Sequence, residues 1–194
     1  RPSKPPVLYF AGLVEAERGQ LDAACNWWKQ ADQQSLNIRP LILSGLESSL
    51  SPEEIVWQLA PDERGLWQLF TRARSDQRRE DQLWLANNYA EHFEELAADQ
   101  QRTDVHFWKR AAEVFESLPH DGRDVDCLAS AMRLAPTNYE LHRRYALALK
   151  RAGRITEARQ ELEWCLMKQP DDSRVTQALQ TLGSASAGGD VRGI

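Results

Sequence analysis

Apolar residues recur every three or four positions along much of the chain, and two such stretches meet at Gly153. Before this glycine, apolar residues spaced four apart share one face of a helix, namely Leu141, Tyr145 and Leu149. After it, a second helical stripe consists of Ile155, Ala158, Leu162, Cys165 and Leu166. Glycine can adopt the left-handed conformation that ends a helix, and Pro170 closes the second stripe. The pattern therefore predicts a helical hairpin over residues 138–170.

The same hairpin pattern occurs twice more in the chain. Pro136 ends another apolar helix, as Pro170 does for the hairpin above. The apolar residues of that earlier unit are Trp108, Ala111, Ala112, Phe115, Leu128 and Ala131. A third copy near the start of the chain consists of Gly19, Leu21, Ala24, Trp28 and Ala31. Because a single hairpin cannot bury both of its apolar faces, we expect these units to stack on neighbouring helices.

This pattern resembles the tetratricopeptide repeat, a helix–turn–helix of about 34 residues with a turn glycine, small residues in the second helix and a final proline. The spacing from Pro136 to Pro170 equals this repeat length. The clear units cover residues 5–38, 105–138 and 139–172, whereas residues 39–104 are degenerate. The resemblance implies an all-α fold. It would be a right-handed α–α superhelix of about five helical hairpins, with a C-terminal capping helix at residues 173–182. Strict alternation of apolar and polar residues is missing, so no strand is predicted.

The pattern predicts a single repeat domain over residues 7–182. Residues 1–6 are basic and proline-rich and are expected to form a linker. They are either ordinary domain-boundary sequence or a segment that follows a membrane helix in a parent protein. Residues 183–194 are rich in glycine, serine and alanine and are expected to form a flexible tail. Asp171 or Asp172 is expected to cap the last helix.

A helix start with a clear physical basis lies inside the degenerate region. Ser51 can cap a helix that begins at Pro52, and Glu54 can bond back to the capping residue. Ala60 and Pro61 then end this helix. Together with a short apolar stretch before it, the pattern predicts two helices that are too short for a full repeat unit.

Two longer helices are predicted over residues 62–75 and 81–99. A cluster of cations near the end of the first helix complements the helix dipole or, alternatively, binds an anion or an acidic partner; it consists of Arg72, Arg74, Arg78 and Arg79. Asn87 and Asn88 are poor helix formers within the second helix. They are either solvated or face a groove.

Composition excludes several classes of function. A net charge of -5 gives no electrostatic reason to bind nucleic acid, so no nucleic-acid partner is expected. No apolar run approaches the roughly 18 residues of a membrane-spanning helix, and no signal peptide is recognisable, so we expect no membrane insertion by this fragment. The three cysteines each lie in an apolar helical stripe and are expected to be buried residues rather than disulfide partners or metal ligands; they are Cys25, Cys127 and Cys165.

No catalytic pattern is present in the sequence. The four histidines are never three or four residues apart; they are His92, His106, His120 and His142. No metal-binding motif, phosphate-binding loop or nucleophile elbow occurs, and the many carboxylates are explained by solvated helix faces. We therefore expect no enzymatic activity, no metal and no cofactor.

The functional hypothesis derives from the shape that the resemblance implies. In a stack of hairpins the first helices line a concave face, which binds an extended or helical peptide. The exposed first-helix positions are Arg72, His106, Lys109, Glu113, Glu140, Arg143, Leu147 and Lys150. We expect this groove to bind an acidic peptide of a partner protein through its cations, which are Arg72, Lys109, Arg143 and Lys150. The alternative is that these cations are ordinary solvated residues.

One known mode of recognition is not expected. Members of the family that grip the C-terminal carboxylate of a peptide use a lysine and an asparagine four residues apart in a first helix. Here Lys109 is followed four residues later by Glu113, and Arg143 is followed by Leu147. That carboxylate clamp is therefore not predicted.

Two other functions remain open. The order of a Ser-Pro-Glu-Glu helix and an Ala-Pro-Asp helix, over about thirty residues, is similar to repeat domains attached to bacterial polysaccharide-polymerising membrane proteins. The chain would then be a soluble repeat appendage of a larger membrane or cell-envelope protein. Alternatively, the stack self-associates edge to edge as a structural module. The sequence leaves open the partner's identity, the oligomeric state, and whether the domain is cytoplasmic or attached to a membrane protein.

Overall fold

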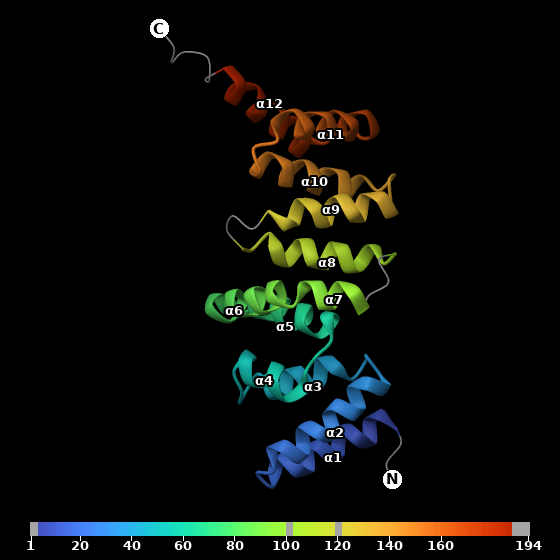
Figure 1. The fold of residues 1–194 in the computed structure, drawn as a ribbon, viewed down its shortest axis with the longest axis vertical. Helices are drawn as coiled ribbons and strands as arrows, with labels where there is room; N and C mark the ends of the chain where they lie inside the picture. Colours follow the sequence, from blue (N-terminus) through green and yellow to red (C-terminus); the bar gives the residue numbers. More distant parts are fainter. Residues whose placement is uncertain (1–3, 100–102, 119–121, 188–194) are drawn as a thin grey trace. The chain divides into compact units, whose positions relative to one another are not determined.

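The computed structural model describes residues 4–99, 103–118 and 122–187 (Figure 1). Within these residues the protein is all-α, as predicted, and has no strand. The described residues form twelve α-helices, whereas five hairpins and a capping helix would give eleven. Contacts within the chain divide it into two compact units, unit 1 (Arg1–Leu96) and unit 2 (Ala97–Ile194). The prediction of one continuous repeat domain over residues 7–182 stays a prediction, because the two units are defined separately.

Unit 1 contains two extensively packed helix pairs and two short helices. Its helices are α1 (Pro5–Glu17), α2 (Leu21–Gln34), α3 (Arg39–Leu46), α4 (Pro52–Leu59), α5 (Glu63–Ser75) and α6 (Arg79–Glu91), and α7 (Phe93–Asp99) contains the unit boundary. α1 pairs with α2, and α5 pairs with α6. The eight-residue helices α3 and α4 are the predicted short helices. α3 packs on α2 and α5, and α4 packs on α2 and α6. These two short helices thus pack mainly on other helices and differ from a regular hairpin.

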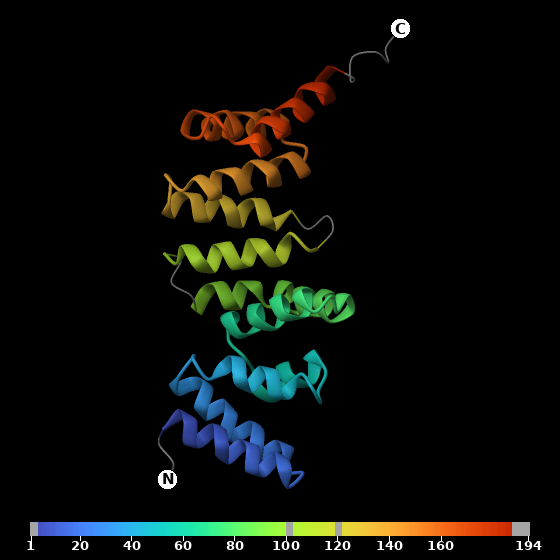
Figure 2. The ribbon, with the colours of Figure 1, turned by 180° about the vertical axis from the view of Figure 1, so that it is seen from behind.

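Unit 2 contains the two adjacent hairpins read from the sequence. Its helices are α8 (Val105–Phe115), α9 (Arg123–Leu134), α10 (Tyr139–Arg151), α11 (Ile155–Lys168) and α12 (Ser173–Ala187). α8 pairs with α9 and α10 with α11, while α10 also packs on α9 and α12 on α11 (Figures 1 and 2). The final helix therefore covers α11, as a capping helix would.

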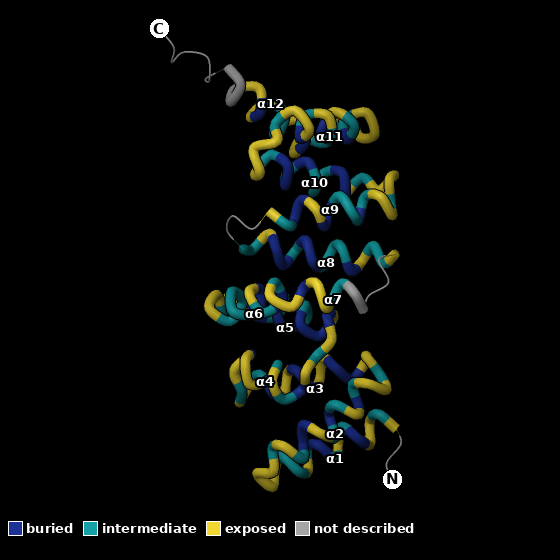
Figure 3. Tube along the Cα trace, in the orientation of Figure 1, coloured by how far each residue is buried: buried dark blue, intermediate teal, exposed yellow. Residues whose placement is uncertain are grey.

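Small side chains allow the paired helices to approach closely. Each of the paired helices has buried stretches along its length (Figure 3). Within these stretches several alanines are completely buried; they are Ala24, Ala31, Ala111, Ala112, Ala131, Ala146, Ala148 and Ala158. A larger side chain at such a position would separate two backbones that the packed core holds together.

Local signals set the helix ends where the sequence predicts them. Ser51 and Glu54 form the capping box: the Ser51 N–H donates to Glu54 Oε2 over 2.8 Å, and the Glu54 N–H donates to Ser51 Oγ over 3.3 Å. Gly153 has φ of 75°, the left-handed conformation expected for the turn glycine. Asp172, rather than Asp171, caps α12 by accepting from the N–H groups of Arg174 and Val175.

Three boundaries differ from the sequence-based expectation. The helix predicted over residues 81–99 is divided at His92, where both the backbone N–H and the ring Nδ1 lie close to the carbonyl of Asn88. Two asparagines with low helix propensity occupy the turn before this break. α12 continues to Ala187, inside the predicted tail, because alanine favours helix. α1 begins at Pro5 within the predicted linker, since proline is favoured in the first helical turn. Residues 1–3 and 188–194 of those segments lie outside the described residues.

A buried guanidinium joins three helices of unit 1. The Arg39 side chain is 5% exposed and donates to both carboxylate oxygens of Asp32, at 2.5 and 2.6 Å. It also donates to both oxygens of Asp62, at 2.6 and 3.1 Å. Asp62 is in turn the N-cap of α5 and accepts from the Gly65 N–H. Burial raises the pKa of Asp62, but the hydrogen bonds from Arg39 and Gly65 outweigh it and lower the pKa overall.

Substituting Gly12 by alanine tests the close approach of α1 and α2. An added Cβ would lie 2.3 Å from Nε1 of the Trp28 indole, which is buried and donates to the Tyr9 carbonyl. We expect Gly12→Ala to lower the free energy of unfolding by about 1–3 kcal/mol. Gly45→Ala is the matched control, because nothing lies within 4 Å of its added Cβ and alanine favours the helix. It should raise the free energy by about 0.5–1 kcal/mol. Urea unfolding followed by tryptophan fluorescence measures both, and equal effects would contradict this packing.

Removing the buried guanidinium should destabilise unit 1 and change its response to acid. Arg39→Met leaves two carboxylates without their shared partner, so we expect a loss of about 3–5 kcal/mol near neutral pH. Because the pKa of Asp62 is lowered in the folded state, its contribution is present above its unfolded pKa of about 3.9 and is lost as pH falls below that value. The acid-induced loss of stability should therefore be smaller in Arg39→Met than in wild type. Arg18→Met, which removes only an exposed pair with Glu15, should change stability by less than about 0.5 kcal/mol.

Candidate functional site

The first helix of unit 2 carries a row of accessible polar side chains. His106, Lys109 and Glu113 are three and four residues apart on α8, so they share one face. His106 is exposed, and Lys109 and Glu113 are half-buried. Phe107 and Val114, each next to a member of the row, are buried. The helix thus presents this row while five of its other residues are buried, namely Phe107, Ala111, Ala112, Val114 and Phe115.

The equivalent row lies on α10, one repeat length further along the chain. Glu140, Arg143 and Leu147 stand at the positions of His106, Lys109 and Glu113 in the next repeat, and Lys150 continues the row by one turn. Arg143 donates to both oxygens of Glu140, from Nε over 3.0 Å and from a terminal nitrogen over 2.9 Å. These residues are exposed or half-buried, whereas α10 buries Leu141, Ala146, Ala148 and Leu149 on its other side.

A hydrogen bond joins the α10 row to the capping helix. Lys150 Nζ donates to Oγ1 of Thr181 over 2.6 Å. Thr181 lies one repeat length after Leu147, so α12 stands where the first helix of a further repeat would stand. We call the accessible surface formed by these three helices the first-helix face; it consists of His106, Lys109, Glu113, Glu140, Arg143, Leu147, Lys150 and Thr181.

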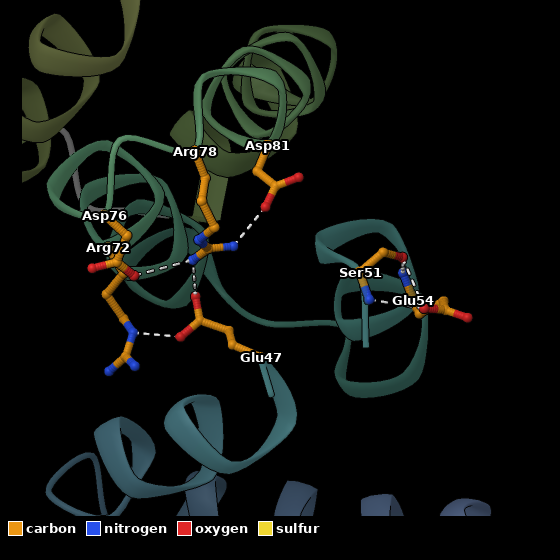
Figure 4. Close-up of polar contacts among 7 residues, drawn as sticks. All are labelled: Glu47, Ser51, Glu54, Arg72, Asp76, Arg78 and Asp81. Atoms are coloured by element: carbon orange, nitrogen blue, oxygen red, sulfur yellow. Dashed lines mark hydrogen bonds and ion pairs between the residues drawn. The ribbon is translucent and has the colours of Figure 1, made fainter. Parts of the chain in front are cut away.

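Arg72, the fourth cation predicted for the groove, lies in unit 1 on α5 and is already paired. Its Nε donates to Glu47, whose side chain is 9% exposed and also accepts from Arg78 over 2.8 Å (Figure 4). Arg78 additionally pairs with Asp81 over 2.6 Å. Burial lowers the pKa of Arg78, but hydrogen bonds to the two carboxylates outweigh it and raise the pKa overall. This cluster links α3 to α5 and α6, so Arg72 has a structural contact, and its part in a groove stays a prediction.

His142, a buried histidine that the sequence analysis did not single out, helps to hold α10 of the first-helix face in place. His142 Nδ1 lies 2.6 Å from the Glu161 carboxylate, and Nε2 lies 2.8 Å from the Pro136 carbonyl. Its ring also stacks on Trp164, with ring centres 3.6 Å apart. Because both partners are acceptors, both ring nitrogens can serve as donors here. These contacts hold α10 against α11 and against the turn that precedes α10. In the sequence, the only sign that His142 is buried is its position next to Leu141 of the apolar stripe.

The described residues include many side chains of the types that bind metal ions or act as nucleophiles. Among them, no group of three or more His, Cys, Asp or Glu side chains could hold a metal ion. Cys25, Cys127 and Cys165 are buried, as expected, and none of them is joined in a disulfide within the described residues. Burial raises the pKa of the Cys165 thiol to about 11, so it is protonated near neutral pH. His120 lies outside the described residues.

A helix that crosses a bilayer must be both long and apolar. No helix in the described part of the chain meets both requirements.

Solved structures with a similar fold are known. The fold is similar to the crystal structure of MamA protein, with a TM-score of 0.52 and 12% sequence identity over 94% of this chain and 82% of that chain. It is also similar to a chain in the crystal structure of the APC/C hetero-tetramer Cut9–Hcn1, with a TM-score of 0.51 and 15% identity over 92% of this chain. This chain covers 36% of that second protein. No curated protein matches the sequence. At these identities the similarity shows the fold, an all-α helical-repeat solenoid.

A match to a known family comes from the sequence of unit 2. The profile of the tetratricopeptide repeat family matches residues 108–182, which run from α8 to α12. These residues contain the two hairpins, the turn glycine at Gly153 and the repeat register of the first-helix face. Residues 108–182 of this chain match the tetratricopeptide repeat family, and the helical pairs of this segment have the arrangement expected of such repeats.

Proposed function

We propose that this chain is a protein-interaction scaffold in which the first-helix face of unit 2 binds a peptide segment of a partner protein. Tetratricopeptide repeats present surfaces to protein partners, which supports the general role. The observation that carries the specific proposal is the row on α8 and its repetition on α10 one repeat length later. Two rows of accessible side chains in the same repeat register form a surface that an extended or helical segment could follow.

The charges of this face favour an acidic segment. Within the described residues Lys109 makes no hydrogen bond or ion pair, and Lys150 donates to the neutral Thr181 hydroxyl, which leaves its charge uncompensated. The pair between Arg143 and Glu140 lies at the surface, and such pairs contribute only about 0–1 kcal/mol. Arg143 can therefore exchange its partner for a carboxylate of the peptide. Leu147, half-buried between Arg143 and Lys150, offers a contact for an apolar side chain of the same segment.

Reversing the charges on this face should abolish recognition of an acidic peptide. Random peptides displayed on phage are selected on the full 194-residue chain, and the affinities of the recovered peptides are measured by fluorescence anisotropy. We expect the recovered peptides to be rich in Asp and Glu. Arg143→Glu combined with Lys150→Glu should weaken their binding by about tenfold or more, because attraction becomes repulsion at two positions.

The matched control reverses two exposed cations on the second helices. Among the contacts of the described residues, Arg133 on α9 bonds to Ser130 and Lys168 on α11 lies over the Trp164 ring, and both contacts are local. Arg133→Glu combined with Lys168→Glu changes the net charge by the same amount and should leave peptide affinity within about twofold of wild type. Equal weakening by both double variants would mean that only the net charge matters, and recovered peptides without acidic residues would contradict the proposed chemistry.

A second candidate function, self-association with a second copy of this chain, is favoured by one observation in unit 1. Val7, Phe10 and Val14 lie three and four residues apart on α1 and are 49%, 62% and 44% exposed. Exposed apolar patches on a protein surface mark interaction sites, and a second copy of the chain is one partner for such a patch. Light scattering should show a concentration-dependent rise in mass that Phe10→Ser removes. A constant monomer mass at high concentration would exclude self-association.

A further inference from the structure

A shallow pocket of about 400 Å³ lies between α4 and α6 in unit 1. Two pairs of residues spaced four apart meet across it: Glu53 and Trp57 on α4, and Trp84 and Asn88 on α6. Glu54 and Val56 complete the lining. Asn88, which was expected to be solvated or to face a groove, thus lines this pocket. All of these residues belong to unit 1, so a ligand of this pocket is independent of the function proposed for unit 2.

One of the residues that line the pocket, Trp57, is unusually exposed for a tryptophan. Trp57 is 78% exposed, although Ile55 and Leu59 on the same short helix are buried. Trp84 across the pocket is half-buried, so part of its indole is also accessible. Because a tryptophan gains more from burial than almost any other side chain, a ligand that covers Trp57 would recover a large apolar contact.

The rim of the pocket is negatively charged. Glu54 Oε2 accepts from both the N–H and the hydroxyl of Ser51, at 2.8 and 2.9 Å (Figure 4). These contacts hold in place a carboxylate that lines the pocket. These hydrogen bonds lower the pKa of Glu54, so it is ionised near neutral pH. Among the described residues no lysine or arginine pairs with Glu53 or Glu54. Both carboxylates therefore keep their charge available to a ligand.

The surrounding helices reinforce this charge. α4 contains two acidic residues and no basic one, and α6 contains three acidic residues and one basic one. Unit 1 as a whole carries 15 acidic and 10 basic side chains, whereas the numbers are equal in unit 2, so the entire net charge of -5 belongs to unit 1. The field at the pocket thus attracts cations and repels anions.

Aromatic faces next to ionised carboxylates form the usual surroundings of a bound organic cation. We infer that the pocket between Trp57 and Trp84 binds the side chain of an arginine or lysine in a basic peptide segment of a partner protein. Arginine fits better, because its planar guanidinium can stack on an indole while its N–H groups reach Glu53 or the free oxygen of Glu54. This surface is distinct from the first-helix face and selects the opposite charge.

Binding of a fluorescein-labelled hexa-arginine peptide to the full chain tests this assignment at about physiological ionic strength. We expect Trp57→Ala to weaken binding by roughly tenfold, because the indole contributes both stacking and cation–π attraction. Trp57→Ala retains every charge, and Trp57 is mostly exposed, so the variant should fold with an unchanged circular dichroism spectrum. In NMR spectra the peptide should shift the indole N–H signals of Trp57 and Trp84 before those of other tryptophans.

Two comparisons separate the pocket from general attraction to an acidic surface. Glu53→Gln should weaken binding severalfold, while Glu17→Gln, which removes a likewise exposed carboxylate on α1, should not. A hexa-glutamate peptide should not bind. The assignment is overturned if hexa-arginine does not bind, if Trp57→Ala binds it as tightly as wild type, or if Glu17→Gln weakens binding as much as Glu53→Gln.

Discussion

The structure depends on how closely two helices can approach within each pair. That distance is set by alanines with no exposed surface, such as Ala24 in unit 1 and Ala112 and Ala158 in unit 2. With small residues at these contacts, larger apolar side chains of the two helices can pack against each other, and each pair buries residues on its inner faces. The polar positions of the first helices are then left at the surface in register, which is why α8 and α10 present matching rows.

Where the repeat pattern weakens, polar contacts take over part of this role. The helices α3 and α4 have eight residues each and cannot supply the apolar area of a full hairpin. In this region Arg39 bridges Asp32 and Asp62, and Glu47 gathers two arginines from later in the chain. Such contacts require particular partners in particular positions, unlike apolar packing. Unit 1 thus has a defined geometry despite its irregular helices, and α4 projects Trp57 away from the core.

Features with a local cause could be predicted from the sequence, and features that join distant residues could not. The turn at Gly153 and the capping box at Ser51 depend on a few adjacent residues, and the rows of the candidate site derive from the period of the repeat. The pairing of Arg143 with Glu140 was visible in principle as a spacing of three residues. The contacts of His142 with Glu161, and the meeting of α4 with α6, depend on tertiary packing. No periodicity in the sequence encodes them.

The burial of all three thiols has a practical consequence for following motions of the protein. Cys25 lies in unit 1, and Cys127 and Cys165 lie in unit 2, each within a helix pair. A thiol reagent in solution can react with them only when the surrounding helices separate, and burial further slows the reaction by keeping Cys165 protonated. The rate of alkylation at each cysteine therefore reports the free energy of local opening in its own unit, without any added label.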